Sequence, residues 1–236
     1  MTDLTDLGTL LGVWAHPDDE TYLTGGLMAA LRDAGHRVVC VTATRGEAAD
    51  PGGTAGERAA LAALRTRELD AALAVLGVDE HHWLDHPDGA CSDADPAAAA
   101  EKLACLVDEV RPDTVITFGP DGFTGHPDHR AINGWVDRAL ELAAATPLVL
   151  HPVAVEPAVD PELDEDFGVF ELGRPRICTP GELALTVPLT GVALDRKVTA
   201  LLRQESQTAG LVAAVGLDRF GAWVATERFA EPAQSG

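Results

Sequence analysis

Short apolar runs alternate with segments of helical periodicity through the first two thirds of the chain. The apolar runs that we predict as strands cover residues 7–14, 37–42, 82–84 and 114–118. Between and after them, apolar residues recur three to five positions apart, or a Gly or Pro marks a helix end. The helices predicted in this way cover 21–34, 56–76, 96–110 and 128–145. This alternation predicts a mainly parallel sheet with helices on both faces.

The pattern is weaker beyond Pro147. We expect strands at 148–155 and 184–188, joined by an acidic segment that contains proline, and a last helix over 194–205. A chain of 236 residues with 46% hydrophobic content is long enough and apolar enough to bury one large core. We therefore expect a single α/β domain.

The chain is strongly acidic, with a formal net charge of -21. Because binding to nucleic-acid phosphates requires clusters of Lys and Arg, this charge argues against a nucleic-acid partner. It also argues against docking on an anionic membrane. The composition therefore directs the search toward chemistry on small molecules.

Two further features bear on the compartment. Residues 1–6 have neither the basic start nor the apolar core of a secretory signal peptide, and no apolar run reaches the ~18 residues that span a bilayer. The four cysteines, Cys40, Cys91, Cys105 and Cys178, form no C-x-x-C pair, which is typical of isolated thiols in a reducing compartment. We expect a cytoplasmic protein without membrane attachment.

The sequence motifs that usually accompany such a sheet are absent. The first strand–helix turn carries no G-x-G-x-x-G, and the chain has no G-x-x-x-x-G-K-[ST] phosphate loop. It also has no G-x-S-x-G nucleophile turn of a serine hydrolase. Loops rich in Asp and His are the best remaining signal.

Two of these loops have similar chemistry and similar positions. His16-Pro17-Asp18-Asp19-Glu20 follows the first predicted strand, and His126-Pro127-Asp128-His129 follows the fourth. Taken alone, each is also explained as a strand-to-helix turn in which an Asp caps the helix. Together they can meet at the carboxyl edge of one sheet, where open α/β sheets bind their ligands.

A hydrolytic zinc site requires three His or carboxylate ligands and an open position for water. His16, Asp19 and His129 would supply such a set, and Asp18 beside it would be free to act as general base. His126 could then face the substrate.

These residues resemble the PIG-L, or LmbE-like, family of zinc-dependent N-deacetylases. Weaker matches are Thr44-Arg45-Gly46-Glu47 after the second strand, Arg65 and Glu68 in the long helix, Asp88-Gly89, Lys197 and Ser206-Gln207. The resemblance implies a Rossmann-like three-layer sandwich over 1–236, with the metal site in a core of 1–146. Residues 147–236 would add strands, substrate-covering loops between 156 and 179, and a closing helix.

The resemblance also implies roles. His16, Asp19 and His129 would bind one zinc ion per chain, with Asp18 as the general base and His126 stabilising the oxyanion or protonating the leaving amine. Arg65, Glu47 and Asp88 are candidates for binding substrate hydroxyls or supporting the site. An ion pair of Arg65 with Glu68, or a turn role for the two acidic residues, explains them as well.

The implied reaction is removal of the acetyl group from a small N-acetylated amino sugar or glycoside. An amidase acting on a thiol S-conjugate or another non-sugar amide is the alternative with the same site. A non-catalytic metal-binding or sugar-binding protein is disfavoured because Asp18 and His126 accompany the ligands. A two-metal phosphoesterase is disfavoured by the single three-ligand set, and homo-oligomer formation is left open.

A second histidine cluster, His81, His82 and His86, includes a third His-Pro-Asp tripeptide. Its spacing with carboxylates does not favour a metal site. We expect a place at the rim of the site or in a substrate loop instead.

Overall fold

The computed structural model describes residues 4–50, 52–156 and 168–233. Within them the strands form one seven-stranded sheet in the order β3-β2-β1-β4-β5-β7-β6. The strands are β1 Leu10–Trp14, β2 Val38–Thr42, β3 Glu80–Trp83, β4 Thr114–Thr117, β5 Leu148–Pro152, β6 Leu185–Pro188 and β7 Thr226–Ala230. The first five pair in parallel, and β7 pairs antiparallel with both β5 and β6. The prediction of a mainly parallel sheet is confirmed.

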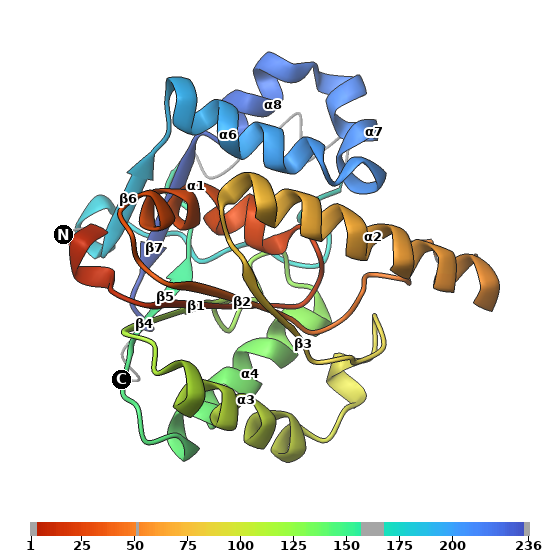
Figure 1. Cartoon of the computed structure of the whole chain (residues 1–236). Helices are drawn as coiled ribbons and strands as arrows, with labels where there is room; N and C mark the ends of the chain where they lie inside the picture. The colour runs from red at the N-terminus through yellow and green to blue at the C-terminus, as the bar shows by residue number, and fades with distance from the viewer. Residues whose placement is uncertain (1–3, 51, 157–167, 234–236) are drawn as a thin grey trace.

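Helices cover both faces of this sheet (Figure 1). The helices of the described residues are α1 Asp19–Asp33, α2 Ala55–Leu76, α3 Pro96–Val110, α4 Pro127–Leu142, α6 Gly191–Leu202, α7 Glu205–Val215 and α8 Leu217–Trp223. Figure 1 shows α3 and α4 on one face and α1, α2 and α6 on the other. This is the predicted three-layer α/β arrangement.

The central strands explain why the sequence shows continuous apolar runs. All residues of β1, β2 and β4 are buried, because a parallel strand between two helical layers is covered on both faces. Trp14 at the end of β1 packs edge-on against Phe118, with ring centroids 5.3 Å apart. The core therefore reaches up to the carboxyl edge of the sheet.

The order of the strands fixes where a ligand can bind. From β1 the chain moves outward through β2 to β3, whereas β4 returns to the other side of β1 and is followed outward by β5. The loops after β1 and β4 thus leave neighbouring strands in opposite directions. Such a switch point leaves a crevice at the carboxyl edge of the sheet, and both predicted loops begin there.

Several predicted boundaries differ from the structure. The first strand begins at Leu10, because Leu4–Leu7 forms a 3-10 helix and Gly8 turns the chain at φ 57°. Helix α1 begins at Asp19, two residues earlier than predicted. The part of the predicted covering segment from 157 to 167 lies outside the described residues.

The C-terminal elements α7, α8 and β7 were not predicted. Strand β7 contains Glu227 and Arg228 and so lacks an apolar run. Glu227 is nevertheless buried, since it accepts hydrogen bonds from Lys197 Nζ and from the backbone N–H groups of Gly26 and Leu27. This buried ion pair joins β7 and α6 to α1.

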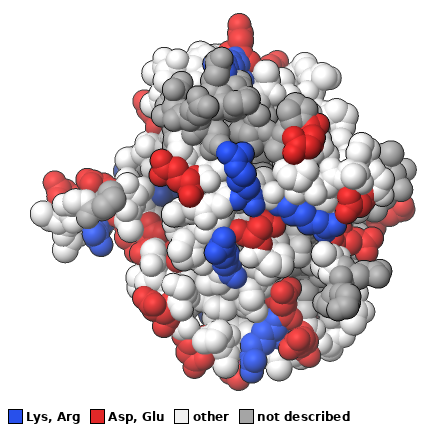
Figure 2. Space-filling view, turned by 180° about the vertical axis from the view of Figure 1, so that it is seen from behind, with Lys and Arg blue, Asp and Glu red and all other residues white. Residues whose placement is uncertain are grey.

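The acidic balance is visible at the surface. On the face shown in Figure 2, Lys and Arg side chains are intermixed with Asp and Glu side chains. Among the described residues, no helix combines the length and apolar character that crossing a bilayer requires.

Candidate metal centre

The loop after β1 is held in an unusual conformation. Asp18 has φ 115°, in the region that residues with a Cβ rarely adopt. Its backbone N–H donates to Glu20 Oε2 at 3.0 Å, and Arg65 donates to the carbonyl oxygen of Pro17 just before it. The fold therefore fixes a strained turn that separates Asp18 from Asp19, the first residue of α1.

The loop after β4 is fixed by the start of α4. His126 is the N-cap, and its Nδ1 accepts a hydrogen bond from the Asp128 N–H at 3.2 Å. Pro127 occupies the first turn, where its missing N–H is not needed. His129 follows one turn later, and its Nδ1 lies 2.9 Å from the carbonyl oxygen of Gly122. That contact leaves His129 Nε2 directed toward His16.

Donor atoms from the two loops form a triangle. His16 Nδ1 lies 3.2 Å from His129 Nε2 and 3.6 Å from Asp19 Oδ2, and His129 Nε2 lies 3.4 Å from Asp19 Oδ1. Ligands bound at 2.0–2.1 Å in a tetrahedral zinc site are about 3.3 Å from one another. The two histidine nitrogens are at this spacing, and the Asp19 carboxylate approaches each of them with a different oxygen. We call these three side chains the donor triangle.

The other ring nitrogen of His16 contacts carboxylates. His16 Nε2 lies 3.0 Å from Asp88 Oδ1 and 3.3 Å from Asp128 Oδ2. A metal-binding histidine typically donates its second N–H to a carboxylate, which fixes the ring and its tautomer. Asp128, a residue of the second predicted loop, lies in position to orient His16 in this way.

Wider groups of possible ligands also occur. Ligand atoms of His16, His126 and His129 lie within 4.8 Å of one another, and so do those of His16, Asp88 and Asp128. His126 Nδ1 is already engaged with a backbone N–H, and Asp88 and Asp128 lie on the Nε2 side of His16. These side chains as a group can hold a metal ion, and His16 belongs to both groups.

Burial and neighbouring charges shift the pKa values of the site. Burial lowers the pKa of His16, but hydrogen bonds to Asp128 and Asp88 outweigh it and raise the pKa to about 10. Burial raises the pKa of Asp18 to about 7, against the opposing charge of Arg65. Burial also lowers the pKa values of His126 and His129. The neutral imidazoles of His126 and His129 are suited to metal binding or hydrogen bonding, and a carboxylate that titrates near neutrality is suited to proton transfer. His16 would have to release a proton to bind a metal.

The three softer candidates contact the protein. Arg65 is only 4% exposed and donates to the carbonyl oxygens of Gly46 and Pro17 and toward Asp18. Glu47 accepts from the Asp88 N–H, and Asp88 accepts from the Ala48 N–H. Direct contact of Arg65, Glu47 and Asp88 with a substrate stays a prediction.

Glu68, the alternative ion-pair partner of Arg65, has other hydrogen-bond partners. Glu68 binds the backbone N–H and the hydroxyl of Ser206. An ion pair between Arg65 and Glu68 is not among the interactions of the described residues.

The histidine cluster near β3 does not join the metal centre. His81 lies 3.0 Å from Thr42 Oγ1 and packs on Trp83, and His86 packs on Trp135. Within the described residues, the possible metal groups contain none of these histidines.

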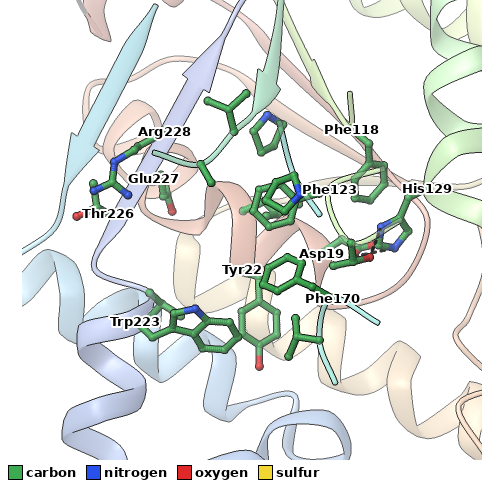
Figure 3. Close-up of a pocket in the computed structure, with 18 of the residues that line it drawn as sticks. Asp19, Tyr22, Phe118, Phe123, His129, Phe170, Trp223, Thr226, Glu227 and Arg228 are labelled. Atoms are coloured by element: carbon green, nitrogen blue, oxygen red, sulfur yellow. Dashed lines mark hydrogen bonds and ion pairs between the residues drawn. The ribbon is translucent and has the colours of Figure 1, made fainter. Parts of the chain in front are cut away.

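Sequence reasoning missed the aromatic support of the site. The Phe118 ring stacks on His129 with centroids 4.0 Å apart and planes within 10°, as Figure 3 shows. Phe118 ends the apolar run before the second loop, so the signal was present, but an apolar run does not reveal which ring faces a ligand.

A model of the family described as "PIG-L: GlcNAc-PI de-N-acetylase" matches residues 11–140, more than half of the chain and both loops of the donor triangle. The chain belongs to the PIG-L family. The resemblance inferred from the two motifs is confirmed.

Curated members of the PIG-L family are similar over much of the chain. A Kineococcus radiotolerans protein named 1D-myo-inositol 2-acetamido-2-deoxy-alpha-D-glucopyranoside deacetylase is 40% identical over 163 residues, covering 57% of this chain and 45% of that protein. A Streptomyces avermitilis protein of the same name is 36% identical over 226 residues, covering 84% and 73% respectively. The chain spans about half the length of the first curated relatives it matches.

A solved structure shares the PIG-L fold of this chain. N,N'-diacetylchitobiose deacetylase from Pyrococcus horikoshii matches with a TM-score of 0.64 and 19% identity, over 96% of this chain and 84% of that chain. At this identity the likeness concerns the fold.

Proposed function

We propose that this protein is a zinc-dependent hydrolase that removes the acetyl group from a small N-acetylated amino sugar or glycoside. The donor triangle of His16, Asp19 and His129, with Asp18 beside it in the sequence, is the observation that carries this proposal. Family membership and the deacetylase names of the relatives support it. The reaction would release acetate and a free amine.

We assign one zinc ion per chain to His16 Nδ1, Asp19 and His129 Nε2. Two nitrogen donors and one carboxylate suit zinc and leave a fourth position open. Asp19 Oδ2 also accepts from the backbone N–H of His16 at 2.8 Å, and Oδ1 lies 3.4 Å from His129 Nε2. We therefore assign the metal to the Asp19 carboxylate without choosing between its two oxygens. When bound, the metal would polarise the amide carbonyl and make a water molecule more acidic.

Asp18 is the proposed general base. Its pKa of about 7 keeps a large fraction ionised near neutral pH while leaving it basic enough to accept a proton. The strained backbone at φ 115° holds its carboxylate apart from that of Asp19. Arg65 on one oxygen of Asp18 limits how that carboxylate can turn, so we assign Arg65 a positioning role.

His126 is proposed to stabilise the oxyanion. Because its Nδ1 accepts a hydrogen bond from a backbone N–H, the neutral ring carries its proton on Nε2. Burial lowers the pKa of His126, which keeps this neutral form predominant. His126 Nε2–H can then donate a hydrogen bond to the developing oxyanion. The proton that Asp18 accepts from water would be available for the leaving nitrogen.

The proposed substrate is a small molecule. The acidic composition disfavours polyanionic partners, and the unpaired state of all four cysteines supports action in the cytoplasm. Glu47 and Asp88 remain candidates for contacts with substrate hydroxyls near His16.

Acetate release from N-acetylglucosamine derivatives tests this function. The panel includes the free sugar, a methyl glycoside and an inositol glycoside, with protein of measured zinc content. Zinc-dependent release from one member is the expected result. The absence of release from every member, with one zinc per chain bound, would reject an acetamido sugar as substrate and leave the amidase alternative.

A further inference from the structure

A pocket adjoins the donor triangle on one side. Its volume is about 310 Å³, and Asp19 and His129 form part of its wall. Next to them the wall is made by Phe118, Phe123 and Phe170 (Figure 3). A group attached to an amide at the donor triangle would therefore meet aromatic rings first.

Another part of the wall is also apolar. It includes Tyr22 of α1, Leu211 of α7 and Trp223 of α8, with the Tyr22 and Trp223 ring centroids 5.9 Å apart. These side chains come from the C-terminal helices and from the first turn of α1, so the pocket is built by the part of the chain in which sequence patterns were weakest.

The buried charges of this wall are already neutralised. Lys197 and Glu227 line the pocket and are each 1% exposed as side chains. Lys197 Nζ donates to Glu227 Oε1 and to the carbonyl oxygen of Tyr22, and both oxygens of Glu227 accept from backbone N–H groups of α1. Thr226 and Arg228 lie at the end away from His129 (Figure 3).

The aromatic part of this pocket offers few hydrogen-bonding partners to a sugar or inositol ring. Its hydroxyl groups would lose water and find few partners between Phe118, Phe123 and Phe170, which is unfavourable. The methyl group of an acetyl would occupy little of the space. A volume of about 310 Å³ far exceeds the space that one water molecule or one methyl group requires.

From this we propose that the substrate carries an apolar group larger than a methyl, an aromatic ring or a short alkyl chain, and that this pocket binds it. The inference rests on the proposed deacylation at the donor triangle. The apolar group has two possible sources, the acyl chain on the nitrogen or the aglycone of the sugar. Ring contacts with Phe123, Phe170 and Trp223 would hold it.

Two substrate series distinguish the sources. One varies the acyl chain from acetyl to butyryl and hexanoyl on methyl glucosaminide, and the other varies the aglycone from methyl to benzyl on N-acetylglucosamine. Since a buried methylene strengthens binding by about fourfold, kcat/KM should rise at least about tenfold along one series. A rise in the first identifies the acyl chain as the source, and a rise in the second identifies the aglycone.

Leu211→Trp tests whether the gain arises in this pocket. The larger side chain fills the pocket from α7, far in sequence from the metal donors, and should reduce the gain along the series to less than about threefold. Leu142→Trp is the matched control, because Leu142 is 53% exposed at the end of α4 and does not line the pocket. A kcat/KM that stays constant along both series in the wild type, or a gain that persists in Leu211→Trp, would overturn the proposal about the pocket. Acetate release in the same experiment would still support the proposed function.

A binding measurement keeps the two proposals separate. Calorimetry of metal-loaded protein with benzyl glucosaminide and with N-hexanoylglucosamine requires no turnover. Binding of one of them at least tenfold tighter than methyl glucosaminide, lost in Leu211→Trp and kept in Leu142→Trp, supports the pocket even if no substrate is hydrolysed. Equal affinities for all three ligands would overturn it.

Discussion

Arg65 of α2 forms an ion pair with Asp18 in the loop after β1, with Arg65 Nη2 3.3 Å from Asp18 Oδ2. The same guanidinium donates to the carbonyl oxygens of Pro17 and Gly46. One buried side chain therefore spans both the loop after β1 and the loop after β2. It also opposes, through its charge, the rise that burial imposes on the pKa of Asp18.

Replacing Arg65 should shift the pH dependence of catalysis. Arg65→Met removes the charge that lowers the pKa of Asp18, so the pKa rises and the acid limb of kcat moves to higher pH. We expect kcat at neutral pH to fall at least about tenfold with a smaller change in KM. Arg67→Met is the control, because Arg67 is exposed on the same helix. An unchanged pH profile in Arg65→Met would refute the positioning role.

Loss of a triangle donor should remove the metal. His129→Ala deletes one of three proposed ligands, so the zinc content after dialysis should fall well below one per chain. The exposed His82, which lies outside the possible metal groups of the described residues, provides the matched His82→Ala control. Metal analysis and circular dichroism on both variants make the comparison. Stoichiometric zinc in a folded His129→Ala protein would show that the ligand set is wrong.

Metal binding should compete with a proton on His16. The pKa of His16 without metal is about 10, and a ligand must be neutral, so apparent zinc affinity rises with pH below that value. Asp88→Asn removes one hydrogen bond that raises this pKa. The variant should therefore show a shallower rise in affinity between about pH 7 and 9, measured by chelator competition. Equal slopes for the two proteins would contradict the view that His16 is a ligand and is protonated in the metal-free protein.

The Lys197–Glu227 pair should be critical for stability. Lys197→Met leaves a buried carboxylate without its counter-charge, which typically costs about 3–5 kcal/mol in the free energy of unfolding. Adding Glu227→Gln removes that charge and keeps an acceptor for the α1 backbone, so part of the loss should be recovered. The control is Glu80→Gln, which breaks the exposed pair with Arg37 and should cost less than about 1 kcal/mol. Urea unfolding measures the free energy of unfolding of each variant. Equal losses of this free energy in Lys197→Met and Glu80→Gln would contradict a critical role for the buried pair.

The sequence predicted those parts of the fold that depend on local pattern. The alternation of buried strands and helices, and the two loops at the carboxyl edge, follow from apolar runs and from His, Pro and Asp at their ends. Strand β7 could not be predicted in this way, because Glu227 is a polar residue whose burial depends on Lys197, thirty positions away, and on the backbone of α1. Arg65 likewise acquires its partners only when Gly46 and Pro17 are brought together.

The proximity of the proposed donors could be predicted from the sequence, and their surroundings could not; that they bind a metal stays a prediction. His16, Asp19 and His129 were proposed from their spacing in the sequence, and the structure places them together. The stacking of Phe118 on His129 and the pocket between Phe170 and Trp223 depend on tertiary contacts. No local pattern specifies which of several apolar residues line a cavity and which fill the core.

Acetate release during zinc titration tests the central claim most directly. Metal-depleted wild-type protein and Asp18→Asn are titrated with zinc, and the rate is measured on the best N-acetylglucosamine derivative. We predict no turnover without zinc and a linear rise to one zinc per chain in the wild type. Asp18→Asn should bind the same zinc yet turn over at least about 100-fold more slowly. Full activity in the depleted protein, or wild-type turnover in Asp18→Asn, would contradict metal-dependent deacetylation with Asp18 as the base.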